Sequence, residues 1–125
     1  MVTEGRKIGD IGERFAAEYL ETKGYKVLGK NFSKPYGEID IIAKKNREII
    51  FVEVKTSKYY KNSDFKPEFR VDKRKIEALG KVCQIYLIEN KFQSKQNWQA
   101  DVISVLLNPD LSLNGIEHFE NIYFG

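Results

Sequence analysis

Two apolar runs of this sequence, 39–43 and 49–54, contain charged residues where a buried strand would carry none. Asp40 lies in the first run, Glu53 lies in the second, and Lys55 follows directly. Burying unpaired charge is costly, so something close to these side chains should compensate their charge. A divalent cation held between Asp40 and Glu53, with Lys55 beside it, would provide that compensation.

The polar residues between the two runs predict a tight hairpin, in which Asn46 suits the positive φ that such a turn requires. If the turn is centred just after Asn46, paired residues have numbers that sum to 93, and Asp40 lies opposite Glu53. Side chains alternate along a strand, so Glu53 and Lys55 share one face of the sheet. Two simpler interpretations stay open. Glu-x-Lys is common on solvated strand faces, and a slip of one residue in register would separate the carboxylates.

A helix over 7–23 would bring a third carboxylate, Glu13, to the hairpin. Apolar residues recur there at helical spacing, and Gly24 is suited to end the helix. On the helical wheel Glu13 lies at the edge of the apolar arc, apart from the charged residues of the polar face. Its small neighbours Gly9, Gly12 and Ala16 indicate that the helix packs closely on an element that Glu13 can reach. The alternative is a partly exposed glutamate on the flank of the helix.

The remaining pattern predicts a single α/β domain over 1–125, with a mixed sheet of four or five strands flanked by helices. A strand, a helix and a strand in succession imply a parallel, right-handed crossover. After the first helix, the expected elements are a strand over 25–32, the hairpin, a helix from Asp72 to about Glu89, a strand over 98–107, and an edge strand or partner-facing tail over 115–124.

A basic segment rich in aromatic residues leaves directly from the charged strand. From Lys58 to Lys75 the net charge is +4, which exceeds the +3 of the whole chain, and tyrosines and phenylalanines lie among the basic residues. Such a segment suits a surface that contacts phosphates and stacks on bases or sugars. The alternative is a solvated loop whose aromatic side chains fold back onto the core. The candidate nucleic-acid contacts are Lys58, Lys61, Lys73, Arg74 and Lys75.

Composition limits the class of protein. With 42% hydrophobic and 31% charged residues, the sequence is that of an ordinary globular domain. The single cysteine, Cys83, excludes an intramolecular disulfide, suits a reducing cytoplasm and is expected in the core. No apolar run approaches the roughly 18 residues of a membrane span, so we expect a cytoplasmic protein without membrane contact. The single histidine, His118, is expected in a structural role rather than a catalytic one.

Taken in order, these motifs resemble the YraN-like family, uncharacterised protein family 102, over nearly the full chain. They are Gly9-x-x-Gly12-Glu13-x-x-Ala16, Asn31-Phe32, Gly37-Glu38-Ile39-Asp40, Phe51-Val52-Glu53-Val54-Lys55-Thr56, Lys75 before a helix ending in Tyr86-Leu87, and Asp101-Val102. That family is similar to the restriction-endonuclease-like nucleases, notably the archaeal Holliday junction resolvases. The resemblance therefore implies a restriction-endonuclease-like sandwich.

The resemblance also implies roles for individual residues. Asp40 and Glu53 become metal-binding carboxylates for Mg²⁺ or Mn²⁺, Lys55 becomes the catalytic lysine, and Glu13 becomes a supporting acid. The implied activity is metal-dependent cleavage of DNA, selective for a structure such as a branch or flap, in repair or recombination. Cutting two strands needs two sites, which a homodimer would supply.

Two departures from the family pattern concern DNA binding. Ser57 stands where the family commonly has arginine, and Gln99-Ala100 stand where it usually has Arg-Phe. Both changes remove positive charge near the expected DNA-facing region. They leave room for two alternatives, a non-catalytic nucleic-acid-binding or adaptor protein with a nuclease fold, and a purely structural cluster in which Lys55 neutralises the carboxylates.

Overall fold

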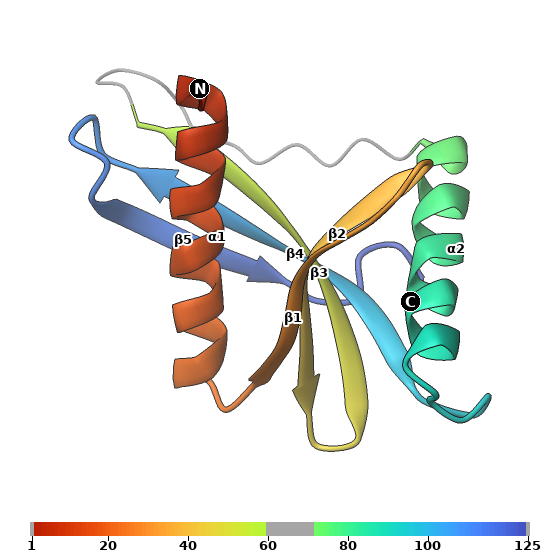
Figure 1. Ribbon diagram of the computed structural model, residues 1–125. Helices are drawn as coiled ribbons and strands as arrows, with labels where there is room; N and C mark the ends of the chain where they lie inside the picture. Colours follow the sequence, from red (N-terminus) through yellow and green to blue (C-terminus); the bar gives the residue numbers. More distant parts are fainter. Residues whose placement is uncertain (1, 60–71, 125) are drawn as a thin grey trace.

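One mixed sheet organises the part of the chain that the structure, a computed structural model, describes: residues 2–59 and 72–124. Its strands lie side by side in chain order, and all neighbours are antiparallel except β3 and β4, which are parallel. This arrangement confirms the predicted mixed α/β sandwich, with five strands (Figure 1). The elements are α1 (Glu4–Thr22), β1 (Lys26–Lys34), β2 (Gly37–Lys45), β3 (Glu48–Lys58), α2 (Lys73–Glu89), β4 (Trp98–Leu107) and β5 (Leu113–Phe119).

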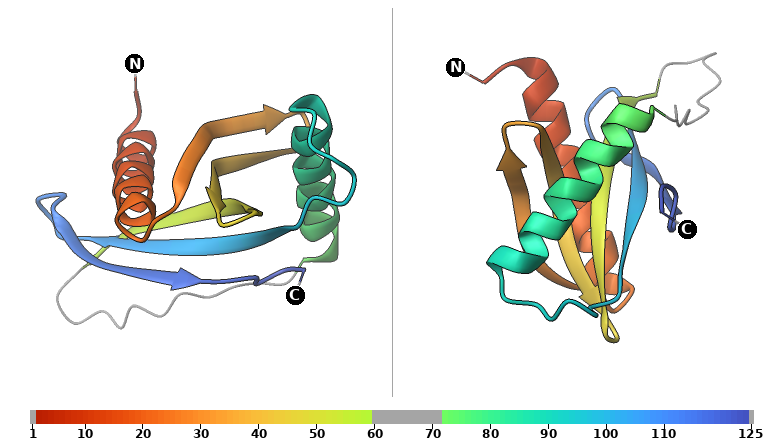
Figure 2. Two further views of the ribbon diagram at one scale, coloured as in Figure 1. Left: turned by 90° about the horizontal axis from the view of Figure 1, so that it is seen from below. Right: turned by 90° about the vertical axis from the view of Figure 1, so that its right-hand side faces the viewer.

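The two helices pack against separate cores on the two faces of the sheet. In Figure 1, α1 lies on the left and α2 on the right, and the strongly twisted sheet passes between them, as Figure 2 also shows. Val52 packs with Ala16 of α1, whereas its neighbour Phe51 packs with Val82 of α2. The predicted alternation along the central strand is therefore confirmed. Cys83 is fully buried on the α2 side, as expected.

The ends of α1 are set by residues on either side of it. The hydroxyl oxygen of Thr3 accepts a hydrogen bond from the Arg6 N–H at 3.2 Å, so the helix begins at Glu4. The predicted start at residue 7 was three residues late, because apolar spacing does not reveal a cap. At the other end Gly24 has a φ of +89°, a conformation that favours glycine and stops the helix as predicted.

The β2–β3 hairpin has the predicted register. Asn46 takes a φ of +56° in the turn, and the pairs run from Lys45–Glu48 to Ile41–Val52. In each of these pairs the residue numbers sum to 93. The ladder ends at Ile41–Val52, one step before the expected pair of carboxylates.

The second half of the chain forms the expected parallel crossover. Asp72 caps α2 by accepting a hydrogen bond from the Arg74 N–H at 2.9 Å, and β4 then pairs with β3 in parallel. The final segment includes a true edge strand, β5, which pairs antiparallel with β4. Neither helix in the described ranges combines the length and apolar character needed to cross a bilayer.

Candidate metal and nucleic-acid site

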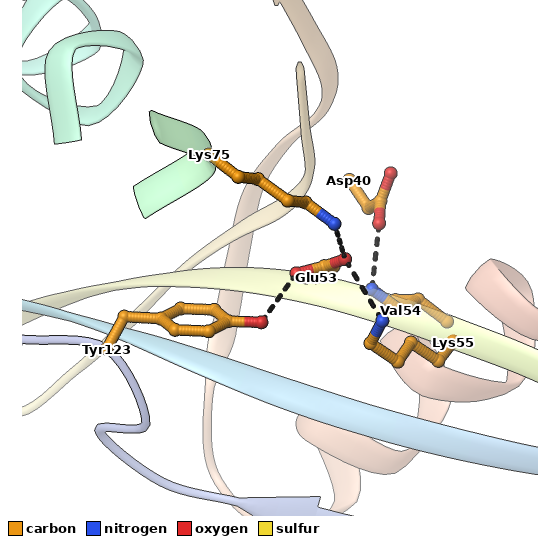
Figure 3. A network of polar contacts seen from close by, with 6 residues as sticks. All are labelled: Asp40, Glu53, Val54, Lys55, Lys75 and Tyr123. Atoms are coloured by element: carbon orange, nitrogen blue, oxygen red, sulfur yellow. Dashed lines mark hydrogen bonds and ion pairs between the residues drawn. The ribbon is translucent and has the colours of Figure 1, made fainter. Parts of the chain in front are cut away.

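Glu53 lies at the centre of a polar cluster on the α2 side of β3 (Figure 3). Its Oε1 lies 3.6 Å from the Lys55 ammonium and 3.4 Å from the Lys75 ammonium, and its Oε2 accepts a hydrogen bond from the Tyr123 hydroxyl at 3.1 Å. Lys55 belongs to the same strand face, whereas Lys75 reaches across from the first turn of α2. The side chain of Glu53 keeps 24% of its exposure, so the cluster is open to solvent.

The predicted pairing of Asp40 with Glu53 across the ladder does not form. Oδ2 of Asp40 instead accepts a hydrogen bond from the backbone N–H of Val54 at 2.7 Å, one residue further along β3 (Figure 3). Opposed like charges destabilise a sheet, and separation of the two strands at this point avoids that contact. The carboxylate of Asp40 thus takes the place of a backbone carbonyl of β2 as the acceptor for the Val54 N–H. Asp40 and Glu53 remain close enough for the charge of Glu53 to raise the pKa of Asp40.

The backbone of the neighbouring strand bends at the same position. Asn31 lies in β1 between residues that pair with Ile39 and Ile41, and therefore opposite Asp40, and it has a φ of +54°. On either side of Asp40 the core packing changes face: Ile39 packs with the α2 cluster and Ile41 with the α1 cluster. The bend therefore puts Asp40 at the point where the two faces meet, within reach of both helices.

Close approach of α1 to β3 brings Glu13 to Asp40. A Cβ atom built on Gly12 would overlap the Thr56 hydroxyl and lie 2.7 Å from Cγ2 of Thr56. Only a glycine allows this contact, and Glu13 follows it directly in the helix. The predicted close packing of this helix and the reach of Glu13 to the hairpin are confirmed.

The carboxyl groups of Glu13 and Asp40 lie next to one another, close enough for each to affect the pKa of the other. Burial raises the pKa of Glu13 to about 7, and the charges of Asp40, Asp10 and Glu38 add to the effect. Burial also raises the pKa of Asp40, which the Val54 N–H partly offsets. Glu13 is therefore the acid of this pair that is readily protonated near neutral pH.

The amide of Asn31 completes this acidic group. With its side-chain nitrogen directed at the carboxylates, Asn31 donates to Glu38 at 3.1 Å and to Glu13 at 3.3 Å. Within residues 2–59 and 72–124, no lysine, arginine or histidine forms a salt bridge with Asp40 or Glu13. Within the described ranges, the donors to this acidic group are instead the backbone N–H of Val54 and the amide of Asn31.

This donor set fits a hard divalent cation. Mg²⁺ binds through one or two carboxylates and keeps several waters, and Asp40 and Glu53 offer carboxylate oxygens on adjoining strands. In the described residues, no three acidic, cysteine or histidine side chains converge closely enough to form a complete protein cage. The arrangement therefore suits Mg²⁺ or Mn²⁺ bound with waters and substrate oxygens, rather than a closed structural site.

A pocket of about 270 Å³ opens beside the two carboxylates, between β2, β3 and the start of α2. Its charged lining residues are Glu38, Asp40, Glu53, Lys75 and Asp101. Its remaining lining includes the aromatic and aliphatic side chains Tyr36, Ile39, Phe51 and Leu79. Tyr36 is 48% exposed, so its ring is accessible to a molecule that enters the pocket.

The predicted nucleic-acid contacts fall into three groups. Lys75 joins the Glu53 cluster, and Lys73 and Arg74 are exposed next to it at the start of α2. Lys58 lies elsewhere, because its ammonium forms a salt bridge with Glu4 at 3.0 Å beside the start of α1. Lys61 lies outside the described residues.

Three residues of the site were not among the predicted site residues. Glu38 stands two residues before Asp40, so alternation along the strand could have placed it beside Asp40. Asn31 also belongs to a visible motif, but its place opposite Asp40 depends on the register between β1 and β2. Tyr123 carried no such signal, because it reaches Glu53 from a segment 70 residues away. Burial, the charge of Glu53 and the hydrogen bond to it raise the pKa of Tyr123 to about 12, so its hydroxyl stays a donor.

His118 has the structural setting that was expected of it. Its Nε2 lies 2.7 Å from Oδ2 of the buried Asp101, and its Nδ1 lies 3.3 Å from the Tyr19 hydroxyl. These contacts tie β5 to β4 and α1, on the face of the sheet opposite to Phe51. The pair lies in the scaffold and not in the Glu53 cluster.

Comparison with known proteins agrees with the motifs. The model of the uncharacterised protein family UPF0102 matches residues 12–105. A UPF0102 protein of Caldanaerobacter subterraneus subsp. tengcongensis is 40% identical over 120 residues, which cover 94% of this chain and 95% of the relative. UPF0102 proteins of Thermotoga maritima (39% over 113 residues; 90% and 94% covered) and Clostridium botulinum (37% over 118 residues; 94% and 94% covered) are also similar. The chain belongs to the UPF0102 family, the family that its motifs resemble.

Proposed function

We propose that this protein is a metal-dependent DNA endonuclease that selects its substrate by structure more than by sequence. The observation that carries the proposal is the arrangement of Asp40, Glu53 and Lys55 around one end of the hairpin ladder, with Glu13 next to Asp40. Two carboxylates can hold a metal ion for phosphodiester hydrolysis, and a lysine and a further acid beside them can stabilise charge and transfer a proton.

Asp40 and Glu53 would hold Mg²⁺ or Mn²⁺, which supplies Lewis-acid polarisation of a phosphoryl oxygen and a more acidic bound water. Val54 fixes Asp40 through its backbone N–H, so one carboxylate oxygen is oriented by the sheet itself. Glu13 would accept or release a proton next to Asp40, because its pKa lies close to neutral.

Lys55 and Lys75 would provide positive charge for the scissile phosphate. Both ammonium groups lie within 3.6 Å of the same Glu53 oxygen, so they are already directed to one point. Lys55 stabilises negative charge that develops on the phosphoryl oxygens, and Lys75 with its exposed neighbours Lys73 and Arg74 holds the adjoining backbone.

The surroundings of the site support selection by DNA structure. Lysine and arginine contacts to phosphates fix position without reading sequence. The largely apolar pocket beside the carboxylates, with the accessible ring of Tyr36, suits an unstacked base, which a flap or branch supplies and an intact duplex does not. A role in repair or recombination would follow, with a homodimer where two strands are cut.

A cleavage panel tests the proposal. Supercoiled plasmid, linear duplex, single strand, flap and four-way junction are each incubated with Mg²⁺, Mn²⁺ or EDTA. We expect metal-dependent cutting by the wild type, none by Asp40→Asn, and retained metal binding without cutting by Lys55→Ala. Cutting by Asp40→Asn at the wild-type rate would contradict the proposed site.

One observation favours a second candidate, a non-catalytic DNA-binding or adaptor protein. Both oxygens of Glu53 already have partners, Lys55 and Lys75 on Oε1 and Tyr123 on Oε2, as in a stable polar cluster. For an adaptor, the wild type would bind junction or flap DNA without cutting it, and Asp40→Asn would leave the DNA affinity unchanged.

A further inference from the structure

The C-terminal segment beyond β5 is fastened to the sheet next to the site. Asn121 has a φ of +53° and turns the chain, and its N–H donates to Oδ1 of the buried Asp101 at 2.9 Å. The N–H of Ile122 donates to the carbonyl of Ala100 at 3.0 Å. Two successive backbone donors thus bind this segment to the start of β4.

Aromatic packing fixes the segment on its other side. The Phe124 ring lies edge-on to Trp98 with a centroid separation of 5.2 Å. A Cβ atom built on Gly80 would lie 3.5 Å from the same ring, so Phe124 also lies against α2. In Figure 1 the C-terminus accordingly lies beside α2.

Tyr123 lies between these two attachments and reaches Glu53. Its hydroxyl is part-buried and lies 3.1 Å from Oε2, whereas the ammonium groups of Lys55 and Lys75 both lie nearest to Oε1 (Figure 3). Among the described residues, Tyr123 is therefore the donor that engages the second oxygen of this carboxylate. Tyr123 also lies outside residues 12–105, the part of the chain that the family model covers.

We propose that Tyr123 is a positioning residue, whose hydroxyl fixes Oε2 of Glu53 and holds the carboxylate in the orientation that a metal ion needs. This inference rests on the proposed function in one respect, the metal ion. Ligating carboxylates are usually hydrogen bonded in turn, and loss of such a partner costs about 10–100-fold in metal affinity or activity. The C-terminal segment is then part of the site rather than a tail.

The test compares Tyr123→Phe with Tyr25→Phe. The first variant keeps the ring and removes only the hydroxyl. The second removes the hydroxyl of a tyrosine in the core on the α1 side, which has no side-chain hydrogen bond within the described residues and lies away from Glu53. Mn²⁺ affinity is measured by calorimetry. Independently of any metal, the ¹³C resonance of the Glu53 carboxylate is followed by NMR, assigned by its loss in Glu53→Gln. Emission of the single tryptophan, Trp98, reports whether Phe124 stays docked.

We expect Tyr123→Phe to move the Glu53 resonance and weaken Mn²⁺ binding about tenfold or more, with Trp98 emission unchanged and Tyr25→Phe like the wild type. An unmoved Glu53 resonance in Tyr123→Phe would overturn the inference. A resonance that moves only together with Trp98 emission would also overturn it, because the hydroxyl would then act by holding the segment. A moved resonance in a protein that binds no Mn²⁺ would support the positioning of Glu53 and reject the proposed function.

Discussion

Glu13 and Asp40 are neighbouring acids that form no salt bridge with a basic residue of the described ranges. Burial is the main reason that the pKa of Glu13 is raised to about 7, and three neighbouring carboxylates raise it further. Because Glu13 follows Gly12, which must contact Thr56, the helix cannot move away to relieve this repulsion. Glu13 therefore lowers the free energy of unfolding by an amount that depends on pH.

The cost has a definite sign. Glu13 has a pKa of about 7 in the folded protein and the ordinary value of 4.5 in the unfolded chain. Between these values the folded state holds a proton that the unfolded state has released, so stability falls as pH rises through this window and levels off above pH 7. Glu13→Gln removes this contribution and should gain about 1 kcal/mol relative to wild type across the window, after discounting for solvent screening of a partly exposed group.

Urea denaturation at pH 4.5, 6 and 8 measures this gain. Glu18→Gln, on the exposed polar face of the same helix, controls for loss of a negative charge. A difference between Glu13→Gln and wild type that does not change with pH would contradict the assignment of the raised pKa to Glu13.

At the scale of elements, the contact between α1 and β3 determines whether the acids meet. A methyl group on Gly12 would collide with the β-branched side chain of Thr56, which has no flexible end to move aside. We expect Gly12→Ala to cost about 1–3 kcal/mol in the free energy of unfolding, and to separate Glu13 from Asp40.

Gly9→Ala is the matched control, one turn earlier in α1. No atom lies within 4 Å of a Cβ built on Gly9, so alanine should add up to about 1 kcal/mol through its better helix propensity. Opposite signs for the two variants in urea denaturation are the expected result. Equal stabilisation by both would show that the close contact at Thr56 is absent in solution.

For the proposed function, the start of α2 would present positive charge to a DNA backbone. Lys73, Arg74 and Lys75 occupy its first turn, and all three side chains are exposed. Lys73→Ala should weaken binding to all DNA substrates about equally and reduce the slope of log affinity against log salt by about 1. Lys95→Ala, an exposed lysine in the connection between α2 and β4, should leave this slope unchanged. An unchanged slope in Lys73→Ala, measured by fluorescence anisotropy from low to physiological salt, would remove α2 from the DNA-binding surface.

At the scale of the whole molecule, local residue preferences were enough to predict most of the fold. Features that depend on long-range contacts were not predicted. Gly24 and Asn46 predicted a helix end and a turn because both residue types tolerate a positive φ, and alternation placed Phe51 and Val52 on the correct faces. The register was correct up to Ile41–Val52, but periodicity holds no information on where two strands separate.

The parts of the site that sequence reasoning missed come from tertiary structure. The bend at Asn31 is a feature of its backbone, where φ is +54°. The residue type does not reveal it, because asparagine also occurs in ordinary strands and turns. Tyr123 approaches Glu53 only because Asp101 and Trp98 bind its neighbours. Contacts of this kind depend on the path of the whole chain, and residue spacing along one element cannot reveal them.

The strands lie in the sheet in the same order as in the chain, and this order affects how the protein folds. Pairing of β1 with β2, and of β2 with β3, closes only short loops, whereas β3 and β4 must find one another across α2 and the residues before it. Closing that long loop costs more entropy, so the seam between β3 and β4 should form late. Glu53 lies on one side of this seam, and Asp101, which fastens the segment bearing Tyr123, lies on the other. A partly folded chain would therefore carry Asp40 and Glu53 on a finished hairpin but lack the completed site.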